Sequence, residues 1–264
     1  MIKPTVTYEL FGGQVEVLIY GKSPHDLTER DLIGIARNLG LKHVYQPQTH
    51  TFNAKICSPF EFTKENKVGG VTIHSGCLAD GVKIVSQGDA VWLRTADCPT
   101  IIAYHSMEGG VVVAHAGRAS LIDESHLRTD QVKRQPESIV QAIYQELIDL
   151  FRSTSVYLDV YSCGGIGPKY FCHPIDHPEY GSFNQKMNHH IALHYSVDCF
   201  LDGKLSNGAL DLHRLIKNQF QFCGIPGDNI HHDFIDTAGQ NDSFFSRRGG
   251  DKTGHNTILV IRRA

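Results

Sequence analysis

Short runs of β-prone apolar residues recur along the chain, and turn residues such as Gly, Asp and Asn separate them. Runs of this length and composition, bounded by turn signals, are typical of β-strands. The pattern predicts strands over the ranges Thr5–Leu10, Gln14–Tyr20, Val71–His74, Gly81–Val85, Ala90–Thr95, Thr100–Tyr104, Val111–Ala114, Val156–Tyr161, Asn229–Ile235 and Thr257–Ile261. Gly12-Gly13 lies between the first two runs, so we predict that they form an opening hairpin.

Three longer segments place their apolar residues at helical spacing instead. Leu27–Leu39 is followed by Gly40, a residue well suited to end a helix, and Asn207–Phe222 is followed by Cys223-Gly224. Between them, Pro136–Phe151 gives the clearest apolar face of the chain, with Pro136 at the expected helix start. The sequence therefore predicts a mixed α/β fold with many strands and three clear helices.

Two polar segments interrupt this pattern. We predict a solvated loop at Lys64–Lys67 and a surface excursion at Asp123–Arg134. No Pro-rich or Ser-rich linker and no internal repeat divides the 264 residues, a length sufficient for a substantial core. We therefore expect one domain spanning residues 1–264.

The stretch from Arg94 to Ser120 contains the most informative pair of residues. The runs Thr100–Tyr104 and Val111–Ala114 are separated by a turn with two glycines, which predicts a β-hairpin. Cys98 precedes the first run and His115 follows the second. Because the ends of adjacent antiparallel strands meet, the hairpin should bring a thiol and an imidazole together at one edge of a sheet.

Two interpretations of this pair are open from the residues alone. Free cysteine is often a small buried hydrophobe, so Cys98 could simply pack. Asp97 before it and the small Ala116-Gly117 after His115 favour a site instead. As a site, the pair could serve metal binding or a cysteine hydrolase in which Cys98 is the nucleophile and His115 its base.

Composition and charge narrow the range of partners. The chain is 41% hydrophobic and 20% charged, with a formal net charge of −3, which leaves no electrostatic signature for nucleic acid or an anionic membrane. No apolar run is long enough to span a bilayer, and the seven cysteines form no CxxC pair. We expect a cytoplasmic protein with reduced thiols and a small-molecule substrate.

Two further segments carry candidate chemistry. Gly165–Pro168 follows a predicted strand but lacks a complete phosphate-loop pattern, so we interpret it as a wall of the pocket. Arg247 and Arg248 stand between Phe244-Phe245-Ser246 and Gly249-Gly250. A guanidinium beside flexible backbone suits a phosphate or carboxylate, although a solvated loop is the ordinary role of such residues.

Six motifs, in order, resemble the landmarks of the YfiH/laccase-domain family, also called polyphenol oxidase, multicopper-oxidase-like or purine nucleoside phosphorylase. They are QTH at Gln48–His50, TADC at Thr95–Cys98, HAG at His115–Gly117, GGIGP at Gly164–Pro168, LDL at Leu210–Leu212 and FFSRR with TG at Phe244–Gly254. The resemblance implies an α-β-β-α arrangement with sheets inside and helices outside. It covers the chain from about Gln48 to the C-terminus.

The resemblance also implies a site. His50, Cys98 and His115 would be three metal ligands, with Cys98 and His115 at the catalytic centre, and His74 is a rival for the third position. Arg248, Gln48 and Arg118 would contact substrate. Two imidazoles and a thiolate suit Zn²⁺ and leave a coordination position open, and Cu²⁺ would also bind.

The function that the resemblance implies is phosphorolysis of inosine or adenosine, with adenosine deamination as an associated activity. The alternatives are the cysteine hydrolase, a copper-dependent phenol oxidase and a non-enzymatic metal-binding protein. The chain departs from the family near the site: Arg118-Ala119-Ser120 stands where relatives have Trp-Arg-Gly after HAG, Pro99 directly follows Cys98, and Phe11 replaces an Arg before Gly12-Gly13. These changes affect positions around the substrate, whereas the three predicted metal ligands are kept.

Overall fold

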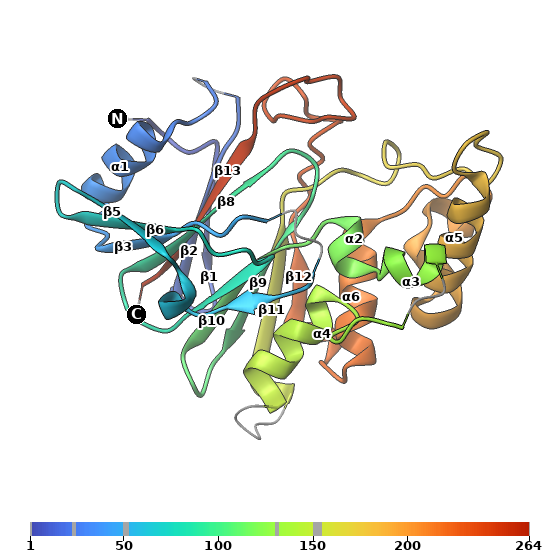
Figure 1. Cartoon of the computed structure of the whole chain (residues 1–264), viewed down its shortest axis with the longest axis horizontal. Helices are drawn as coiled ribbons and strands as arrows, with labels where there is room; N and C mark the ends of the chain where they lie inside the picture. The colour runs from blue at the N-terminus through green and yellow to red at the C-terminus, as the bar shows by residue number, and fades with distance from the viewer. Residues whose placement is uncertain (1, 23–24, 50–52, 130–131, 150–154, 264) are drawn as a thin grey trace.

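The computed structural model describes residues 2–22, 25–49, 53–129, 132–149 and 155–263. It contains two mixed β-sheets that pack face to face, with helices on the outer face of each (Figure 1). The predicted mixed α/β fold and its α-β-β-α layering are confirmed. Within the described part of the chain, no helix has both the length and the apolar character needed to cross a membrane.

The first sheet has seven strands and contains both ends of the described chain. Its spatial order is β1 (Val6–Leu10), β2 (Val15–Tyr20), β13 (Asn256–Arg262), β8 (Asp89–Thr95), β3 (His43–Tyr45), β6 (Val71–Ser75) and β5 (Lys64–Val68). The predicted opening hairpin is present as the antiparallel pair β1 and β2. Strand β3 runs parallel to both of its neighbours.

The second sheet has six strands and contains the central hairpin. Its order is β12 (Ile230–His232), β11 (Leu158–Cys163), β9 (Thr100–His105), β10 (Gly110–His115), β7 (Gly81–Ile84) and β4 (Ile56–Cys57). Strands β9 and β10 pair antiparallel and every residue in them is buried, as expected for a strand covered on both faces.

Side-chain alternation explains why two sheets and two helical layers form. In β9, Ile102 and Tyr104 face the other sheet, whereas Ile101 and Ala103 face the helices. Side chains of the first sheet alternate in the same way: Val91 of β8 points between the sheets, and Trp92 points towards α1. Strands that are apolar on both faces must be covered twice, and this requirement sets the layering.

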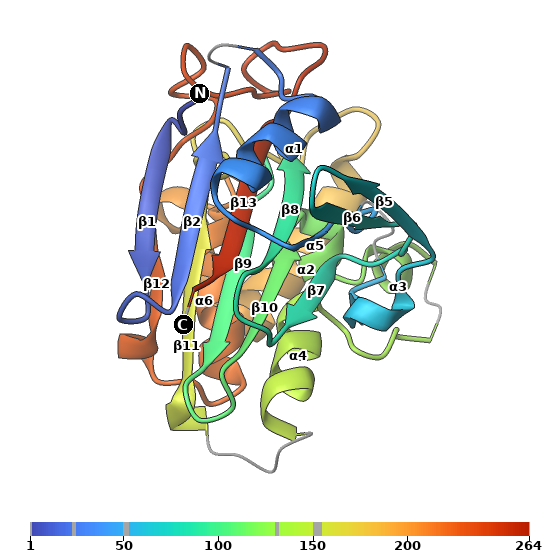
Figure 2. The same cartoon turned by 90° about the vertical axis from the view of Figure 1, so that its left-hand side faces the viewer.

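Helix α1 (Glu29–Asn38) covers the outer face of the first sheet (Figure 2). It begins two residues after the predicted Leu27 because Thr28 caps it in a reciprocal pair with Asp31. Gly40, with a φ of +69°, follows the end of the helix, in agreement with the prediction.

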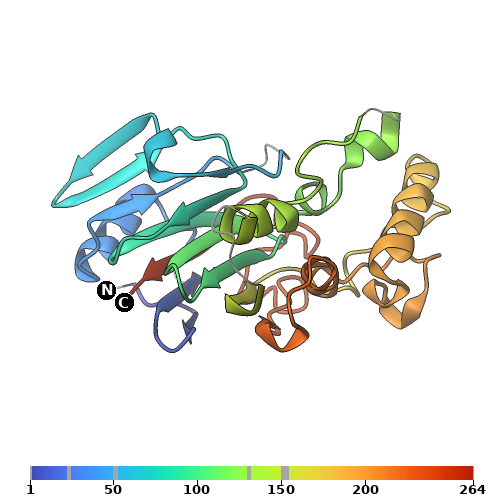
Figure 3. The same cartoon turned by 90° about the horizontal axis from the view of Figure 1, so that it is seen from below.

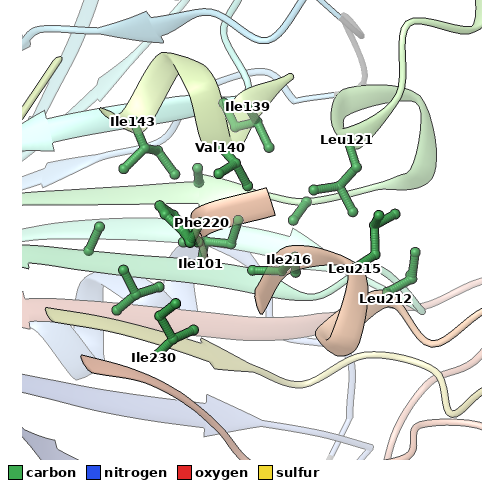
Figure 4. Close-up of a cluster of buried hydrophobic side chains, with 14 of the residues drawn as sticks. Ile101, Leu121, Ile139, Val140, Ile143, Leu212, Leu215, Ile216, Phe220 and Ile230 are labelled. Carbon is green, nitrogen blue, oxygen red and sulfur yellow. The ribbon is translucent and has the colours of Figure 1, made fainter. Parts of the chain in front are cut away.

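The remaining helices lie on the side of the second sheet, so that α1 and α5 stand at opposite ends of the molecule (Figure 3). They are α2 (Arg118–Leu121), α3 (Glu124–Thr129), α4 (Ile139–Tyr144), α5 (Gly181–Tyr195) and α6 (Leu212–Phe222). Figure 4 shows their shared core, in which Ile139 and Ile143 of α4 and Phe220 of α6 surround Ile101 of β9. The core fixes α2 and α3 beside the end of β10.

Three local predictions need correction. Lys64–Lys67 is no loop but part of β5, an exposed edge strand that pairs with β6. Asp123–Arg134 contains helix α3. The helix predicted from Pro136 begins at Ile139, because Ser138 caps it, and continues as a π-helix over Gln145–Asp149.

Candidate active site

A cavity of about 530 Å³ opens beside the end of β10, at the edge of the second sheet. It is bounded by the loop before β9, by α2 and α3, and by two later loops. Its lining residues are Cys98, His115, Gly117, Arg118, Ala119, Asp123, Glu124, Ser125, Arg128, Arg134, Phe171 and Arg248. Four arginines and two acidic residues give the walls a net positive charge, so the cavity suits an anionic or strongly polar ligand.

Cys98 and His115 meet in this cavity, and the hairpin register explains why. Thr100 at the start of β9 pairs with His115 at the end of β10, and Cys98 lies two residues before Thr100. A Cβ atom built on Gly117 would lie 3.1 Å from the Cys98 Sγ atom and 2.9 Å from the His115 Cε1 atom. Sulfur and imidazole therefore converge on one point, and only glycine leaves room between them.

The protonation of Cys98 bears on its chemistry. Burial, with a further contribution from the carboxylate of Asp97, raises the pKa of the Cys98 thiol to about 12, and Arg118 opposes this only in part. A thiol in this environment stays protonated at neutral pH, whereas nucleophilic cysteines have a lowered pKa. A cation bound at the sulfur would favour the thiolate. The environment of Cys98 therefore suits a metal ligand better than a free nucleophile.

Sulfur and imidazole are donors that suit a metal such as zinc, and the structure brings together two of the three residues predicted as ligands, Cys98 and His115. His50 lies outside the described residues, and the described part of the chain contains no group of three or more His, Cys, Asp or Glu arranged to hold a metal. Asp80 connects the segment after residue 53 to the site: its side chain accepts a hydrogen bond from the Ala54 N–H, and its carbonyl accepts one from the His115 N–H. His50 as the third ligand stays a prediction from the motif resemblance.

His74, the rival for that position, has a different environment. It lies in β6 of the first sheet, where its Nε2 atom is 2.9 Å from the Nδ1 atom of His43 and its ring stacks on Tyr45. It does not line the cavity that contains Cys98. The described contacts of His74 thus belong to the first sheet and give no support to its role as a ligand.

Arg248 is held at the cavity by Asp97, a residue adjacent to Cys98. One carboxylate oxygen of Asp97 accepts a hydrogen bond from the Arg248 N–H at 3.1 Å, and the other accepts from the hydroxyls of Ser246 and Thr237. The loop carrying the arginine is thereby attached to the loop carrying the cysteine. The guanidinium of Arg248 lies over the ring of Phe171, 5.6 Å from its centroid, and has no ion-pair partner among the described residues.

Replacement of Asp97 by Ala should therefore misplace Arg248 without removing it. Loss of the hydrogen bond between Asp97 and the Arg248 N–H should weaken saturation by an anionic ligand about tenfold or more, because a hydrogen bond to a charged group has a net value of about 1.5 to 3 kcal/mol. Steady-state kinetics should show the change in KM for the anion rather than in kcat. An equal loss in kcat with an unchanged KM would contradict this positioning role.

Arg118 occupies the position after the HAG motif and lies at the cavity wall. Its Nε atom donates to Glu124 of α3 at 2.7 Å, and Arg128 approaches the other oxygen of the same carboxylate at 3.5 Å. The displaced guanidinium of this chain is thus part of a cluster with α3, the helix that the sequence analysis interpreted as a surface excursion.

Other residues predicted for the site are not among the described residues that line the cavity. Gln48 is exposed, and its backbone N–H donates to the Cys77 carbonyl. Gly165 packs against Pro99, where an added Cβ would lie 2.8 Å from the proline ring, and the Ile166 N–H donates to the Asp97 carbonyl. The segment Gly165–Pro168 therefore supports the Cys98 loop and is not among the residues that line the cavity. Arg247 contacts Asp251 and His255.

Sequence reasoning missed Phe171, Glu124 and Arg128 as cavity residues. The spacing of Glu124 and Arg128, four residues apart on a charged segment, could have predicted helix α3, since such pairs lie on one helix face. Phe171 carries no comparable signal because it lies in a loop far from Cys98 in the sequence.

Comparisons with known proteins agree with the fold. The family model described as multi-copper polyphenol oxidoreductase laccase matches residues 29–263. The structure of the hypothetical protein YfiH from Bacillus licheniformis is 17% identical and superposes with a TM-score of 0.68, covering 95% of this chain and 93% of that protein. YlmD from Geobacillus stearothermophilus is 17% identical with a TM-score of 0.66, covering 95% and 92%.

A third similar structure, of a Neisseria meningitidis protein, is 19% identical, with a TM-score of 0.63 and coverage of 98% of this chain and 99% of that protein. At these identities the similarity establishes the fold alone. No curated protein sequence matches the chain.

Proposed function

Because the chain belongs to the family described as multi-copper polyphenol oxidoreductase laccase, we propose that it is a metal-dependent enzyme that cleaves purine nucleosides by phosphorolysis. The observation that carries the proposal is the convergence of the Cys98 sulfur and the His115 ring in a cavity lined by arginines. Phosphorolysis needs a place for the nucleoside and a place for phosphate in one cavity. Here the pair Cys98 and His115 would hold the metal beside the nucleoside, and the arginines would bind phosphate. The motifs that resemble the purine nucleoside phosphorylase group add the substrate class.

In this proposal Cys98, His115 and His50 would hold Zn²⁺, and the ion would supply a Lewis acid for an oxygen of the substrate. Sulfur and imidazole donors are the ligands that zinc prefers in proteins, and three protein ligands leave a position for substrate. Cu²⁺ would bind the same donors, so the metal has to be identified by elemental analysis.

The side chains of this chain account for the rest of the reaction. Arg248 binds phosphate and places one of its oxygens towards C1′ of the ribose, while Phe171 offers a ring face for the nucleoside. The C1′–N9 bond breaks and its electron pair stays on the base, which takes up a proton from solvent or phosphate. The phosphate oxygen forms the new bond to C1′, and ribose 1-phosphate is released.

The competing functions use the same atoms in other ways. A cysteine hydrolase would need Cys98 as a thiolate, and the raised pKa of this thiol opposes that role. Adenosine deamination would consume water and release ammonia, whereas phenol oxidation would consume dioxygen. Each reaction therefore has its own co-substrate, which makes the functions separable by experiment.

We expect metal-loaded protein to convert inosine or adenosine to base and ribose 1-phosphate only when phosphate is present. Chromatography of the products with and without phosphate measures this directly, with ammonia and dioxygen followed in the same samples. Equal rates of base release in phosphate-free buffer would rule out phosphorolysis and favour a hydrolase. Turnover of phenols without turnover of nucleosides would assign the oxidase function instead.

A further inference from the structure

A second cavity, of about 460 Å³, adjoins the candidate active site. The two cavities share Arg118, Arg128 and Arg248 as a common wall. The far side of the second cavity is formed by the loop from Cys172 to Tyr180 and by the start of α5. Each cavity lies within the usual range for a small-molecule site, and together they can take a ligand larger than a nucleoside.

The shared wall carries an excess of positive charge. Glu124 is the carboxylate that pairs with both Arg118 and Arg128, and it can neutralise only one of them. Arg248 has no ion-pair partner among the described residues. A guanidinium has five N–H donors, and Glu124 engages only a few of those available, so the wall keeps donors free for an anion.

Two contacts orient the partly exposed side chain of Arg128. Its guanidinium lies 3.6 Å from the ring centroid of Phe183 in α5, and it approaches Glu124 at 3.5 Å. Arg118 lies 6.0 Å from the same ring. Contact with an aromatic face orients a guanidinium, and this lowers the entropy cost of binding an anion.

His173 adds a neutral polar group to the second cavity. The residue is 4% exposed, its ring nitrogens are buried, and its ring packs in a T-shaped contact with Phe171. Burial, followed by Arg118 and Arg248, lowers the pKa of His173 to about 3, so at neutral pH the imidazole has one N–H donor and one acceptor.

We propose that the second cavity is a phosphate-group subsite formed by Arg118 and Arg128 beside the buried His173, and that this enzyme prefers a phosphorylated nucleoside to a free one. This inference rests on the proposed function, because it places the base and ribose beside Cys98 and His115. The phosphate of the substrate then lies across the shared arginine wall. Arg128 is the residue that distinguishes this subsite, since it belongs to α3 and contacts no part of the metal pair.

The reaction stays balanced with such a substrate. With inosine 5′-monophosphate, the C1′–N9 bond breaks, the base leaves with the electron pair and takes up a proton, and inorganic phosphate bonds to C1′. The products are hypoxanthine and ribose 1,5-bisphosphate. The 5′-phosphate is unchanged and serves only for recognition.

Zinc-loaded protein should be titrated calorimetrically with inosine, inosine 5′-monophosphate and inorganic phosphate, and turnover should be measured on the first two with phosphate present. We expect the monophosphate to bind at least about tenfold more tightly than inosine, the value of one strong charge-assisted contact. Arg128→Gln should reduce this preference to about twofold or less. Arg214→Gln, at an exposed arginine of α6 outside both cavities, is the matched control and should keep the full preference.

The outcomes separate this proposal from the proposed function. Equal binding of inosine and its monophosphate, or a preference that survives Arg128→Gln, overturns the subsite even if inosine is cleaved with phosphate. Loss of inorganic phosphate binding in Arg128→Gln without any preference for the monophosphate assigns the subsite to free phosphate and also overturns the proposal. A preference that depends on Arg128 supports the subsite even if neither compound is cleaved, in which case the phosphorolysis proposal alone fails.

Discussion

Cys98→Ala protein is expected to lose its zinc and, with it, all measurable nucleoside cleavage. Wild-type protein should contain about one zinc per chain, because three ligands define a single site. Removal of a ligand should weaken zinc binding on the order of a hundredfold or more, since even outer-sphere partners of metal ligands cost tenfold to a hundredfold. Elemental analysis after dialysis measures the metal, and the nucleoside assay measures activity on the same samples.

Cys223→Ala is the matched control, because Cys223 is also a half-buried cysteine but follows α6, away from Cys98. It should keep both metal and activity. His50→Ala and His74→Ala then identify the third ligand: loss of zinc in the first supports His50, and loss in the second alone shows that His74 was the right choice. Unchanged zinc in Cys98→Ala would refute the metal site itself.

The layered fold could be predicted because the strong signals were local. Runs such as Thr100–Tyr104 and Val111–Ala114 are apolar at successive positions, and a strand of this kind is buried on both faces. The α1 and α6 helices carry their own caps, at Thr28 and Asp211, and apolar residues at helical spacing. Local propensity and tertiary burial agree at these elements.

The sequence pattern did not predict the elements that depend on a neighbouring strand or helix. Every residue of β5 is exposed, and Lys64–Lys67 has no β-prone pattern of its own, so the strand exists because β6 supplies hydrogen-bonding partners. Helix α3 is short and has no buried residue. Its stability comes from contacts with α5, including Arg128 on Phe183, which a single sequence does not reveal.

The same difference between local and long-range signals applies to the candidate site. Cys98 and His115 could be expected to meet, because a hairpin determines which strand ends are neighbours. The presence of Phe171 and Arg128 in the cavity could not be expected, because their position depends on how α3 and a distant loop pack against the second sheet. Asp97 was noticed only as a polar neighbour of Cys98, whereas the structure shows that it fixes the loop of Arg248.

Arg248→Ala should weaken saturation by phosphate about tenfold to a hundredfold, because a charge-assisted contact in a partly desolvated cavity has a value of roughly 1.5 to 3 kcal/mol. Arg248→Lys should lose nearly as much, since it keeps the charge but not the planar fork that binds two oxygens at once. The measurement is the apparent KM for phosphate at saturating nucleoside. Zinc content and unfolding temperature should match the wild type, because the Arg248 side chain contacts Phe171 and neither Cys98 nor His115 in the described structure.

Arg247 provides a control within the same motif, since its guanidinium donates to the main-chain carbonyl of Asp251, contacts the His255 ring and lines neither cavity. Arg247→Ala should therefore saturate with phosphate like the wild type. If Arg248→Ala also does so while Arg118→Ala does not, phosphate is held by the guanidinium that follows the HAG motif. The anion would then lie against Glu124 and α3, and the role assigned to Arg248 would belong to Arg118.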